Sequence, residues 1–312
     1  MKIIFFGTPL FAAKVLQSLI EKNIEIVAVV SKPDKPQGRS SKLIPTPVKE
    51  VALKYSIPCF QPEKVSGSEF IDVLPQFHPD LFVVVAYGEI IKQHILDIPK
   101  KGSINLHASL LPKYRGAAPI QRAIIDGEKE TGVSIIYLVK KMDAGDILAT
   151  ESTPISSEDT YETVSERLCE IGTRLTLKVI AEIENGSQHR ITQDESKVTY
   201  AHKLELEDCE INWNESAESI HNLVRGVNPF PGAWSYIFIG EEKKRLKIFV
   251  TEVLKGEDAP AFCELRYDKG LGLIVGCGQG GLVLKELQVE GKKRVSSHEL
   301  LRGVNFKNIR FK

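Results

Sequence analysis

A buried strand near residue 85 is the feature that most constrains the fold. Residues 80–88 read Asp-Leu-Phe-Val-Val-Val-Ala-Tyr-Gly, an apolar run that ends in a glycine. A strand that is apolar on both faces must be covered on both, as in the centre of a parallel sheet between helices. Residues 3–6, 10–22 and 26–30 follow a strand, helix, strand pattern. This βαβ order predicts an α/β domain with a parallel sheet at the start of the chain.

The later part of the chain shows two other patterns. Apolar residues recur every three or four positions over residues 160–184, and Gly186 follows at a C-cap position, so a long helix is expected there. Residues 187–207 are polar and mixed, which favours a linker. Beyond a helix at 216–225, short alternating runs are typical of a small antiparallel barrel or sandwich. These runs cover residues 234–239, 246–253, 271–276 and 282–289.

These patterns predict two domains. The boundaries we expect are residues 1–188 for an α/β catalytic domain, 189–207 for a linker and 208–312 for an antiparallel β domain. At 312 residues the chain is long for a single core, which supports this division. The first turn reads Gly7-Thr8-Pro9, so the glycine fingerprint of dinucleotide-binding domains is absent.

Composition narrows the class of protein. The 41 basic and 41 acidic residues cancel, so a surface that binds a polyanion would have to come from local clustering. The five cysteines are scattered and include no C-x-x-C pair, which argues against zinc and disulfide frameworks and fits a reducing cytoplasm. The apolar run at the N-terminus is too short for a signal peptide or a membrane span.

Three residues on two segments form the candidate catalytic site. Asn105 and His107 are two apart on an expected strand, so their side chains leave from the same face. Asp143 opens the turn-like sequence Asp-Ala-Gly-Asp. An amide, an imidazole and a carboxylate supply an oxyanion donor, a base and an orienting group. This set suits acyl transfer without a covalent enzyme intermediate, and the sequence contains no Gly-x-Ser-x-Gly nucleophile motif.

Each of these residues also has an ordinary structural interpretation. A lone histidine is more often a buried, hydrogen-bonded core residue, and asparagine and aspartate are common in turns. Their position favours function, because residues at strand ends in an open α/β sheet lie where ligands bind. Residues 109–119 add a loop with apolar residues that no helix or strand pattern requires.

The sequence around this site resembles the folate-dependent formyltransferase superfamily. The resemblance is carried by residues 105–116, Asn-Leu-His-Ala-Ser-Leu-Leu-Pro-Lys-Tyr-Arg-Gly, together with residues 143–146. It implies a Rossmann-like formyltransferase domain followed by an OB-like antiparallel β-barrel that binds tRNA. Further segments are similar to the branch of the family that formylates methionyl initiator tRNA, namely residues 6–9, 32–49, 83–88, 115–122, 194–203, 211–213 and 225–232.

The resemblance also implies a reaction and a role for each site residue. A formyl group passes from N10 of the cosubstrate 10-formyltetrahydrofolate to the α-amine of methionine on initiator tRNA. Asn105 would stabilise the oxyanion. His107 would take the proton from the attacking amine or hold the protonation pattern that lets this proton leave, and Asp143 would orient and tune His107. No metal is required, and no cluster of histidines and carboxylates in the sequence offers one a site. The residues expected to line the folate site are Tyr87, Gly88, Ser109, Leu110, Leu111 and Pro112.

A basic segment after the second strand is the candidate RNA contact. Residues 31–50 contain five basic and two acidic residues, with prolines and a glycine that break regular structure. The ordinary interpretation is a solvated loop, whereas the resemblance implies contact with the acceptor stem, through Arg39 above all and through Lys35 and Lys42. Residues 209–312 have 16 basic and 13 acidic residues. Their basic clusters, at 243–247 and 292–294, are candidates for phosphate contacts.

Three other functions remain open. A sugar-nucleotide N-formyltransferase would use the same folate donor but would lack the basic insertion. A glycinamide ribonucleotide formyltransferase is shorter and has no second domain. A non-catalytic RNA-binding protein with the same fold would not need Asn105, His107 and Asp143 together. We expect a cytoplasmic, monomeric enzyme that has initiator methionyl-tRNA and folate as partners and does not bind membranes.

Overall fold

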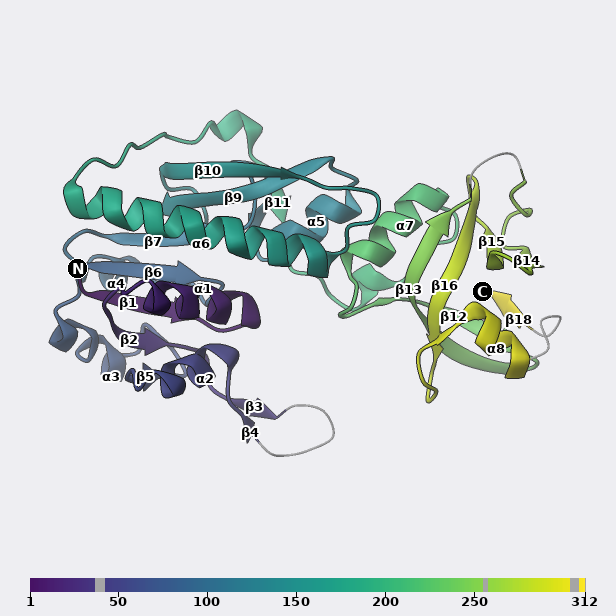
Figure 1. The fold of residues 1–312 in the computed structure, drawn as a ribbon, viewed down its shortest axis with the longest axis horizontal. Helices are drawn as coiled ribbons and strands as arrows, with labels where there is room; N and C mark the ends of the chain where they lie inside the picture. The colour runs from purple at the N-terminus through teal and green to yellow at the C-terminus, as the bar shows by residue number, and fades with distance from the viewer. Residues whose placement is uncertain (37–42, 255–257, 304–308, 312) are drawn as a thin grey trace. The chain divides into compact units, whose positions relative to one another are not determined.

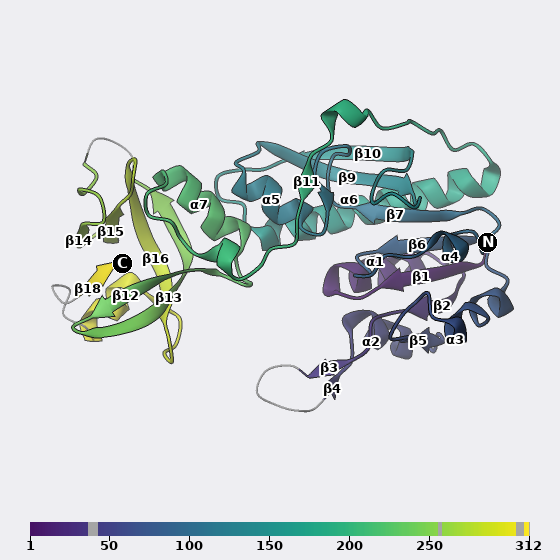
Figure 2. The same ribbon diagram turned by 180° about the vertical axis from the view of Figure 1, so that it is seen from behind.

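The chain folds into two compact units, drawn in Figures 1 and 2. The computed structural model describes residues 1–36, 43–254, 258–303 and 309–311. Unit 2 includes two short segments that come from within the sequence of unit 1. Unit 1 consists of Met1–Pro119, Glu130–Pro154 and Ser165–His202, and unit 2 consists of Ile120–Lys129, Ile155–Val164 and Lys203–Lys312.

Unit 1 is built on a seven-stranded sheet in the order β10-β9-β7-β6-β1-β2-β5. Strands β5, β2, β1, β6 and β7 run parallel, and β9 and β10 add an antiparallel edge. The parallel sheet expected from the βαβ pattern is confirmed, and β10 is a strand that the sequence patterns did not predict. The strands are β1 Ile3–Gly7, β2 Ile26–Val30, β5 Cys59–Phe60, β6 Leu81–Val85, β7 Ser103–His107, β9 Glu130–Tyr137 and β10 Ile147–Pro154.

The expected long helix, α6, covers one face of this sheet. It runs from Tyr161 to Asn185 and lies in front of the strands in Figure 1 and behind them in Figure 2. A Cβ at Gly172 of this helix would come within 2.7 Å of the Leu106 side chain, so β7 turns Leu106 toward α6. The other helices in this part of the chain are α1 Leu10–Glu21, α2 Pro47–Lys54, α3 Ser68–Ile71, η1 Leu74–Phe77, α4 Gln93–Leu96 and η2 Glu195–Lys197.

The polar segment after α6 is attached to unit 1. Its strand β11, Tyr200–Ala201, pairs in parallel with β8, Arg115–Gly116, in the loop that follows β7. A Cβ at Gly116, whose φ is +129°, would come within 2.5 Å of the Ala201 carbonyl oxygen, so glycine is required at this close approach. The domain boundaries at residues 188 and 208 stay a prediction.

Unit 2 contains an antiparallel sheet in the order β14-β15-β16-β13-β12-β18, with β17 paired to β16. The expected antiparallel strands are confirmed. The barrel stays a prediction, because β14 and β18, the two ends of the described sheet, are not paired with each other. No described helix is long and apolar enough to cross a membrane. The elements are η3 Glu207–Cys209, β12 Ala233–Ile239, β13 Glu242–Val253, β14 Leu265–Asp268, β15 Gly272–Gly276, β16 Gly281–Val289, β17 Val295–Ser296, β18 Ile309–Phe311, α5 Pro119–Ile125, α7 Ala217–Gly226 and α8 Ser297–Gly303.

The core of unit 2 explains why α7 forms where the sequence predicts it. Ser216 caps the helix, and its hydroxyl oxygen accepts a hydrogen bond from the Ser219 N–H. The buried face of the helix presents Ile220 and Val224 to a cluster that also contains Ile237 of the sheet. The amphipathic helix therefore closes the apolar face of the antiparallel sheet.

Candidate active site

Asn105 and His107 lie at the carboxyl end of β7, at the edge of the sheet where the parallel strand β6 also ends. The register pairs Asn105 with Val84 of β6. Their exposed fractions are 9% and 5%. Since side chains alternate across a strand, both point to the face opposite Leu106. The expectation that one strand face presents both side chains is confirmed.

The two ring nitrogens of His107 have different neighbours. Nε2 lies 2.9 Å from the carbonyl oxygen of Tyr114, which can only accept, so Nε2 donates its hydrogen there. Nδ1 then keeps its lone pair, and it lies 3.7 Å from Oδ2 of Asp143. The carboxylate therefore faces the nitrogen that would gain a proton, and its charge would stabilise the resulting imidazolium. The structure brings His107 and Asp143 together, as expected.

Asp143 is held in a tight turn between β9 and β10. Its backbone φ is +50°, in the left-handed region that Asp tolerates better than most residues. Its Oδ2 accepts a 2.8 Å hydrogen bond from the Gly116 N–H. A Cβ at Gly145 would come within 1.8 Å of the Tyr137 carbonyl oxygen, so only glycine fits there. The turn and its contacts with Gly116 and Tyr137 together fix where the carboxylate points.

The side-chain amide of Asn105 is available to bind a ligand. No hydrogen bond joins it to another residue in the described part of the chain. The arrangement thus combines an available N–H donor with a proton acceptor that a carboxylate supports. Among the described residues, no group of three histidines, cysteines or carboxylates could hold a metal ion.

The loop after β7 carries four of the expected folate residues. Ser134 of β9 braces it, because its hydroxyl donates to the Ser109 carbonyl oxygen at 2.7 Å and accepts from the Leu111 N–H at 3.1 Å. Ser109 is fully buried. The loop is therefore fixed against the sheet next to His107. Its residues are Ser109, Leu110, Leu111 and Pro112, and their contact with folate stays a prediction.

Tyr87 and Gly88 follow β6 at the same edge. The Tyr87 ring is 2% exposed and packs edge-on against Phe6 at 5.6 Å. Burial raises the pKa of the Tyr87 hydroxyl. Its oxygen is buried and has no hydrogen-bond partner among the described residues. Gly88 is exposed and has a φ of +87°. The role expected for these two residues in folate binding also stays a prediction.

The basic segment after β2 contains more structure than its prolines suggested. β3, Lys35–Pro36, pairs in antiparallel fashion with β4, Leu43–Ile44, so the expectation of no regular structure is wrong at these residues. An edge strand accommodates proline because one side of it needs no N–H donor. Lys35 is exposed. Arg39 and Lys42 lie outside the described residues.

Other cations of this segment are already paired. Lys32 lies 2.7 Å from Glu89, and Lys49 lies 2.6 Å from Asp34. Hydrogen bonds from Gln61 and Lys49 lower the pKa of the Asp34 carboxyl. These lysines therefore fix the start and the end of the segment, which leaves Lys35 as its exposed cation in the described part.

One face of the β12–β13 pair combines aromatic and basic side chains. The Lys243 ammonium lies 3.8 Å from the centre of the Tyr236 ring, and the Arg245 guanidinium lies 4.4 Å from the Trp234 ring. Residues two apart on a strand share a face, so the cross-strand pairs continue the pattern. We call this surface the β12–β13 face; its pairs are Trp234 with Lys247, Tyr236 with Arg245, and Phe238 with Lys243.

Several neighbouring cations have acceptors within unit 2. Lys244 lies 2.6 Å from Glu242, and Lys247 donates to the Pro231 carbonyl oxygen at 2.8 Å. Arg294 pairs with Glu286. The basic clusters expected from the sequence are thus partly neutralised. Of their described members, Lys243 and Arg245 stack on rings of β12, and Arg294 stacks on the Phe249 ring at 4.3 Å.

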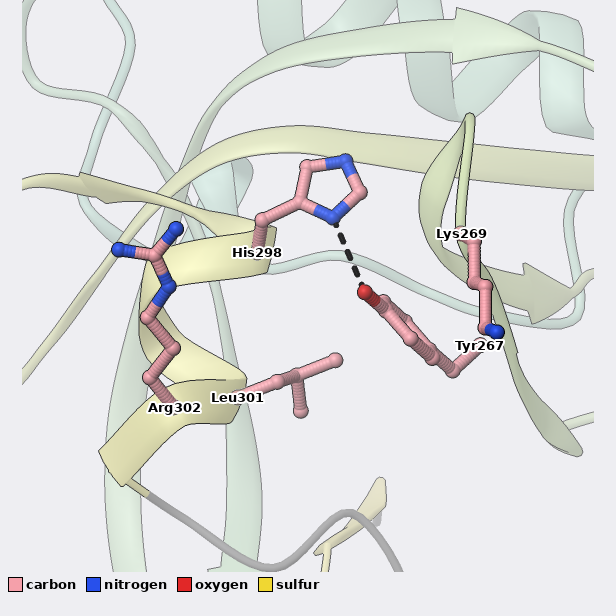
Figure 3. Close-up of a pocket in the computed structure, with 5 residues that line it drawn as sticks. All are labelled: Tyr267, Lys269, His298, Leu301 and Arg302. Atoms are coloured by element: carbon pink, nitrogen blue, oxygen red, sulfur yellow. Dashed lines mark hydrogen bonds between the residues drawn. The ribbon is translucent and has the colours of Figure 1, made fainter.

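A cavity of about 520 Å³ is a further feature of unit 2, shown in Figure 3. The Tyr267 hydroxyl and Nδ1 of His298, two groups that line it, form a hydrogen bond of 3.2 Å. None of the expected catalytic residues lines it. The lining residues are Tyr267, Lys269, His298, Leu301 and Arg302.

Sequence reasoning missed the residues that surround the Asp143 turn. The sequence analysis gave no role to Arg115, which lies in the family motif. It assigned Gln193 and Glu195 to the expected linker. Hydrogen bonds from Arg115 and Lys141 lower the pKa of the Glu195 carboxyl to about 2. No local pattern marks these residues, because their partners lie far away in the sequence.

Comparison with known proteins places the chain in a family. Residues 1–180 match the family described as Formyl transferase, and residues 203–305 match Formyl transferase, C-terminal domain. The chain therefore belongs to the formyltransferase family, and the resemblance inferred from its motifs is confirmed.

Close relatives within this family are methionyl-tRNA formyltransferases. The protein of that name from Protochlamydia amoebophila strain UWE25 is 54% identical, with 100% of this chain and 98% of the relative covered. The one from Sulfurihydrogenibium sp. strain YO3AOP1 is 43% identical, with 98% of each covered. The solved structure of WlaRD, a sugar 3N-formyl transferase in the presence of dTDP and 5-N-formyl-THF, has a TM-score of 0.67 at 20% identity, covering 94% of this chain and 99% of that chain. At that identity the likeness shows the fold alone.

Proposed function

We propose that this protein transfers the formyl group of 10-formyltetrahydrofolate to the α-amine of methionyl initiator tRNA. The observation that carries the proposal is the pairing of His107 with Asp143 beside the free Asn105 amide, in a chain 54% identical to a methionyl-tRNA formyltransferase. The product would be used to start translation, so we place the enzyme in the cytoplasm. Its five free cysteines fit that compartment. We expect it to act as a monomer.

The chemistry divides between the three residues. The neutral methionyl amine attacks the formyl carbon, and Nδ1 of His107 takes the proton that the amine loses. A free α-amino group has a pKa of about 7.7–8.0, and an adjacent ester lowers it, so an imidazole is a well-matched base. Asp143 stabilises the imidazolium. The bond from the formyl carbon to N10 then breaks, N10 receives the proton, and formylmethionyl-tRNA and tetrahydrofolate leave.

Stabilising the oxyanion is the larger demand, because an amide-like formyl group is a poor electrophile. The Asn105 N–H group lies on the same strand face as His107 and has no competing partner among the described residues. Donors that are fixed before the reaction stabilise developing charge without reorganising. We assign Asn105 to the formyl oxygen for this reason.

The folate is expected at the carboxyl edge of the sheet. Ser109 to Pro112 follow β7, and Tyr87 and Gly88 follow β6, so the two loops lie beside the same catalytic face. The buried Tyr87 hydroxyl, which lacks a partner among the described residues, is a candidate donor to the cosubstrate.

The tRNA is expected to meet two basic surfaces. The first is the segment that contains Lys35, Arg39 and Lys42. The second is the β12–β13 face, where the Lys243 and Arg245 cations stack on aromatic rings. Cations held over aromatic rings suit nucleic acid, because their charges can contact phosphates. The Trp234 ring is buried in the core of unit 2, so it orients Arg245 and does not itself stack on a base.

One assay separates this function from its main alternative. The purified protein is incubated with 10-formyltetrahydrofolate and either methionyl initiator tRNA or an amino-sugar nucleotide, and the formylated product is measured. We expect product from the tRNA only. Product from the sugar nucleotide alone would replace the proposal with a sugar-nucleotide N-formyltransferase, and RNA binding without any product would replace it with a non-catalytic protein.

Arg39→Ala tests the RNA side of the proposal. The substitution should weaken use of methionyl-tRNA at low salt and leave folate binding unchanged, since a guanidinium on that segment has no part in folate chemistry. Lys22→Ala removes an exposed cation outside the segment and is the matched control. Equal rates for Arg39→Ala and the parent would leave RNA recognition to the β12–β13 face.

A further inference from the structure

Arg115 is completely buried, at the centre of the loop that follows β7. Its guanidinium donates to the side-chain oxygen of Gln193 from Nε at 3.1 Å and from Nη2 at 2.7 Å. Nη2 also donates to Glu195 at 2.8 Å. The guanidinium is therefore directed at a segment about 80 residues further along the chain, and not at solvent.

Gln193 links Arg115 to the Asp143 turn. Its side-chain nitrogen donates to the carbonyl oxygens of Asp143 and Gly145, both at 2.8 Å. Gln193 is only 6% exposed. Because its oxygen is fixed by Arg115, its nitrogen can point only toward the turn. The amide thus joins Arg115 to both ends of the turn that carries the Asp143 carboxylate.

The Asp143 turn needs such support. A non-glycine residue with a φ of +50° persists only where its surroundings hold it. The 3.7 Å distance between Asp143 Oδ2 and His107 Nδ1 depends on where this turn lies. A shift of about 1 Å at a catalytic group can cost about 100-fold in rate.

The backbone on either side of Arg115 touches the same two catalytic residues. The carbonyl of Tyr114 accepts from His107, and the N–H of Gly116 donates to Asp143. Pairing with β11 fixes this stretch, because the Arg115 N–H donates to the Thr199 carbonyl oxygen at 2.9 Å. One three-residue segment therefore positions the imidazole, the carboxylate and, through Gln193, the turn.

We propose that Arg115 and Gln193 are positioning residues, which act on the reaction by holding Asp143 against His107. The inference rests on the proposed function, because it assigns these residues to that same site. A role in stability alone explains the geometry less well. Nη1 of Arg115 is buried with no partner among the described residues, and an apolar side chain would avoid that cost.

Gln193→Glu is the sharpest test, because it changes one atom. The glutamate keeps an acceptor for Arg115 but replaces the two N–H donors with an oxygen that repels the Asp143 and Gly145 carbonyls. We expect kcat to fall about 100-fold with little change in the KM for folate or tRNA. Arg115→Lys keeps the charge but not the forked geometry, so it should retain a higher kcat than Arg115→Met. Gln76→Glu is the matched control and should stay within about twofold of the parent, because Gln76 donates to the Asp72 carbonyl oxygen at an exposed position away from the site.

A double-mutant cycle separates positioning from general stability. If Arg115 and Gln193 act through Asp143, then Gln193→Glu should have no further effect on kcat in an Asp143→Ala background. Rate losses that multiply would overturn the proposal, as would a parent-like kcat in Gln193→Glu. A crystal structure of Gln193→Glu gives a second measurement that does not depend on activity. An Asp143 turn that stays in place would overturn the proposal, whereas a parent chain unable to formylate methionyl-tRNA would overturn the proposed function instead.

Discussion

Each unit of this protein buries an arginine, and the two are used in different ways. Arg115 of unit 1 is fully buried and bonds to a side-chain amide that leads to the Asp143 turn. Arg225 of unit 2 is 7% exposed and donates from Nη1 to the carbonyl oxygens of Ser156 at 3.1 Å and Asp159 at 3.0 Å. Burial lowers the pKa of the Arg225 guanidinium.

The partners of a buried cation decide what it does. Arg225 joins α7 to a connecting segment of the same unit, and no expected catalytic residue depends on that contact. Arg115 reaches the turn that holds a carboxylate beside His107. We therefore expect substitutions in unit 1 to lower the rate more than the stability, and substitutions at Arg225 to do the opposite.

The largest expected effect tests the catalytic role of unit 1. His107→Ala should lower kcat by about 100- to 10,000-fold, the range for removal of a general acid or base, and the protein should still fold. Formylation rates with saturating folate and methionyl-tRNA measure it. His94→Ala removes an exposed histidine of α4 and is the control. A near-parental kcat would remove His107 from the mechanism.

Asn105→Ala should have the next largest effect and lower kcat by about 100- to 1000-fold, the usual loss when one oxyanion donor is removed. The loss should fall on kcat, because the amide is expected to bind the formyl oxygen most strongly in the transition state. Single-turnover rates with bound folate check this. A change confined to the KM for folate would show instead that Asn105 binds the ground state.

Arg225→Met sharpens the comparison between the two arginines. It leaves two carbonyl oxygens without their donor, so the free energy of unfolding should fall by about 2–4 kcal/mol. The kcat of the folded fraction should stay within about twofold of the parent. Urea unfolding and kcat are measured side by side, with the exposed Arg302→Met as control. A rate loss as large as that of Arg115→Met would show that the two arginines do not differ in their use.

Replacing both Lys243 and Arg245 with alanine tests whether unit 2 binds tRNA through the cations that lie over aromatic rings. Affinity for tRNA should fall about tenfold at low salt, and the salt dependence should weaken by about one unit of slope for each phosphate that the variant can no longer neutralise. Lys244→Ala is the matched control on the same strand, because Lys244 is already paired with Glu242. Binding equal to that of the parent in the double variant would exclude the β12–β13 face.

The smallest effect concerns the pH dependence of unit 2. Burial is the main cause that lowers the pKa of His221, which lies between the Thr251 hydroxyl and the Ser157 carbonyl oxygen. Arg225 lowers this pKa further, and Glu158 and Glu218 raise it. A group whose folded pKa is depressed stabilises the fold above its unfolded pKa, about 6.5 for histidine, and this contribution is lost as the pH falls below that value.

His221→Gln should therefore flatten the fall in stability between about pH 6.5 and pH 5. Urea unfolding of the parent and the variant at several pH values measures the slope, and the exposed His94→Gln is the control. An unchanged slope would mean that other groups set the acid sensitivity of unit 2.

Much of the fold and part of the site could be predicted from local patterns. The apolar run of β6 and the βαβ unit predicted the parallel sheet, and residue alternation placed Asn105 and His107 on one face. The segment at 189–207 shows where such patterns fail. Its polar composition favours a linker, yet Gln193 and β11 bond to the loop after β7. A polar segment gives the same local signal whether its hydrogen bonds go to water or to a distant loop.

The sequence by itself determined the βαβ unit, the buried strand β6, the long helix α6 and the turn-like segment at 143–146, because these depend on patterns within a few residues; β10 and the β3–β4 pair did not follow from it. Only the tertiary structure decided which nitrogen of His107 faces Asp143 and which side chains hold the Asp143 turn. Gln193 bonds to residues 50 and 78 positions away, Asp143 and Arg115. Contacts of that range follow from how the whole unit packs, since the order and register of the strands set which loops come within hydrogen-bond distance.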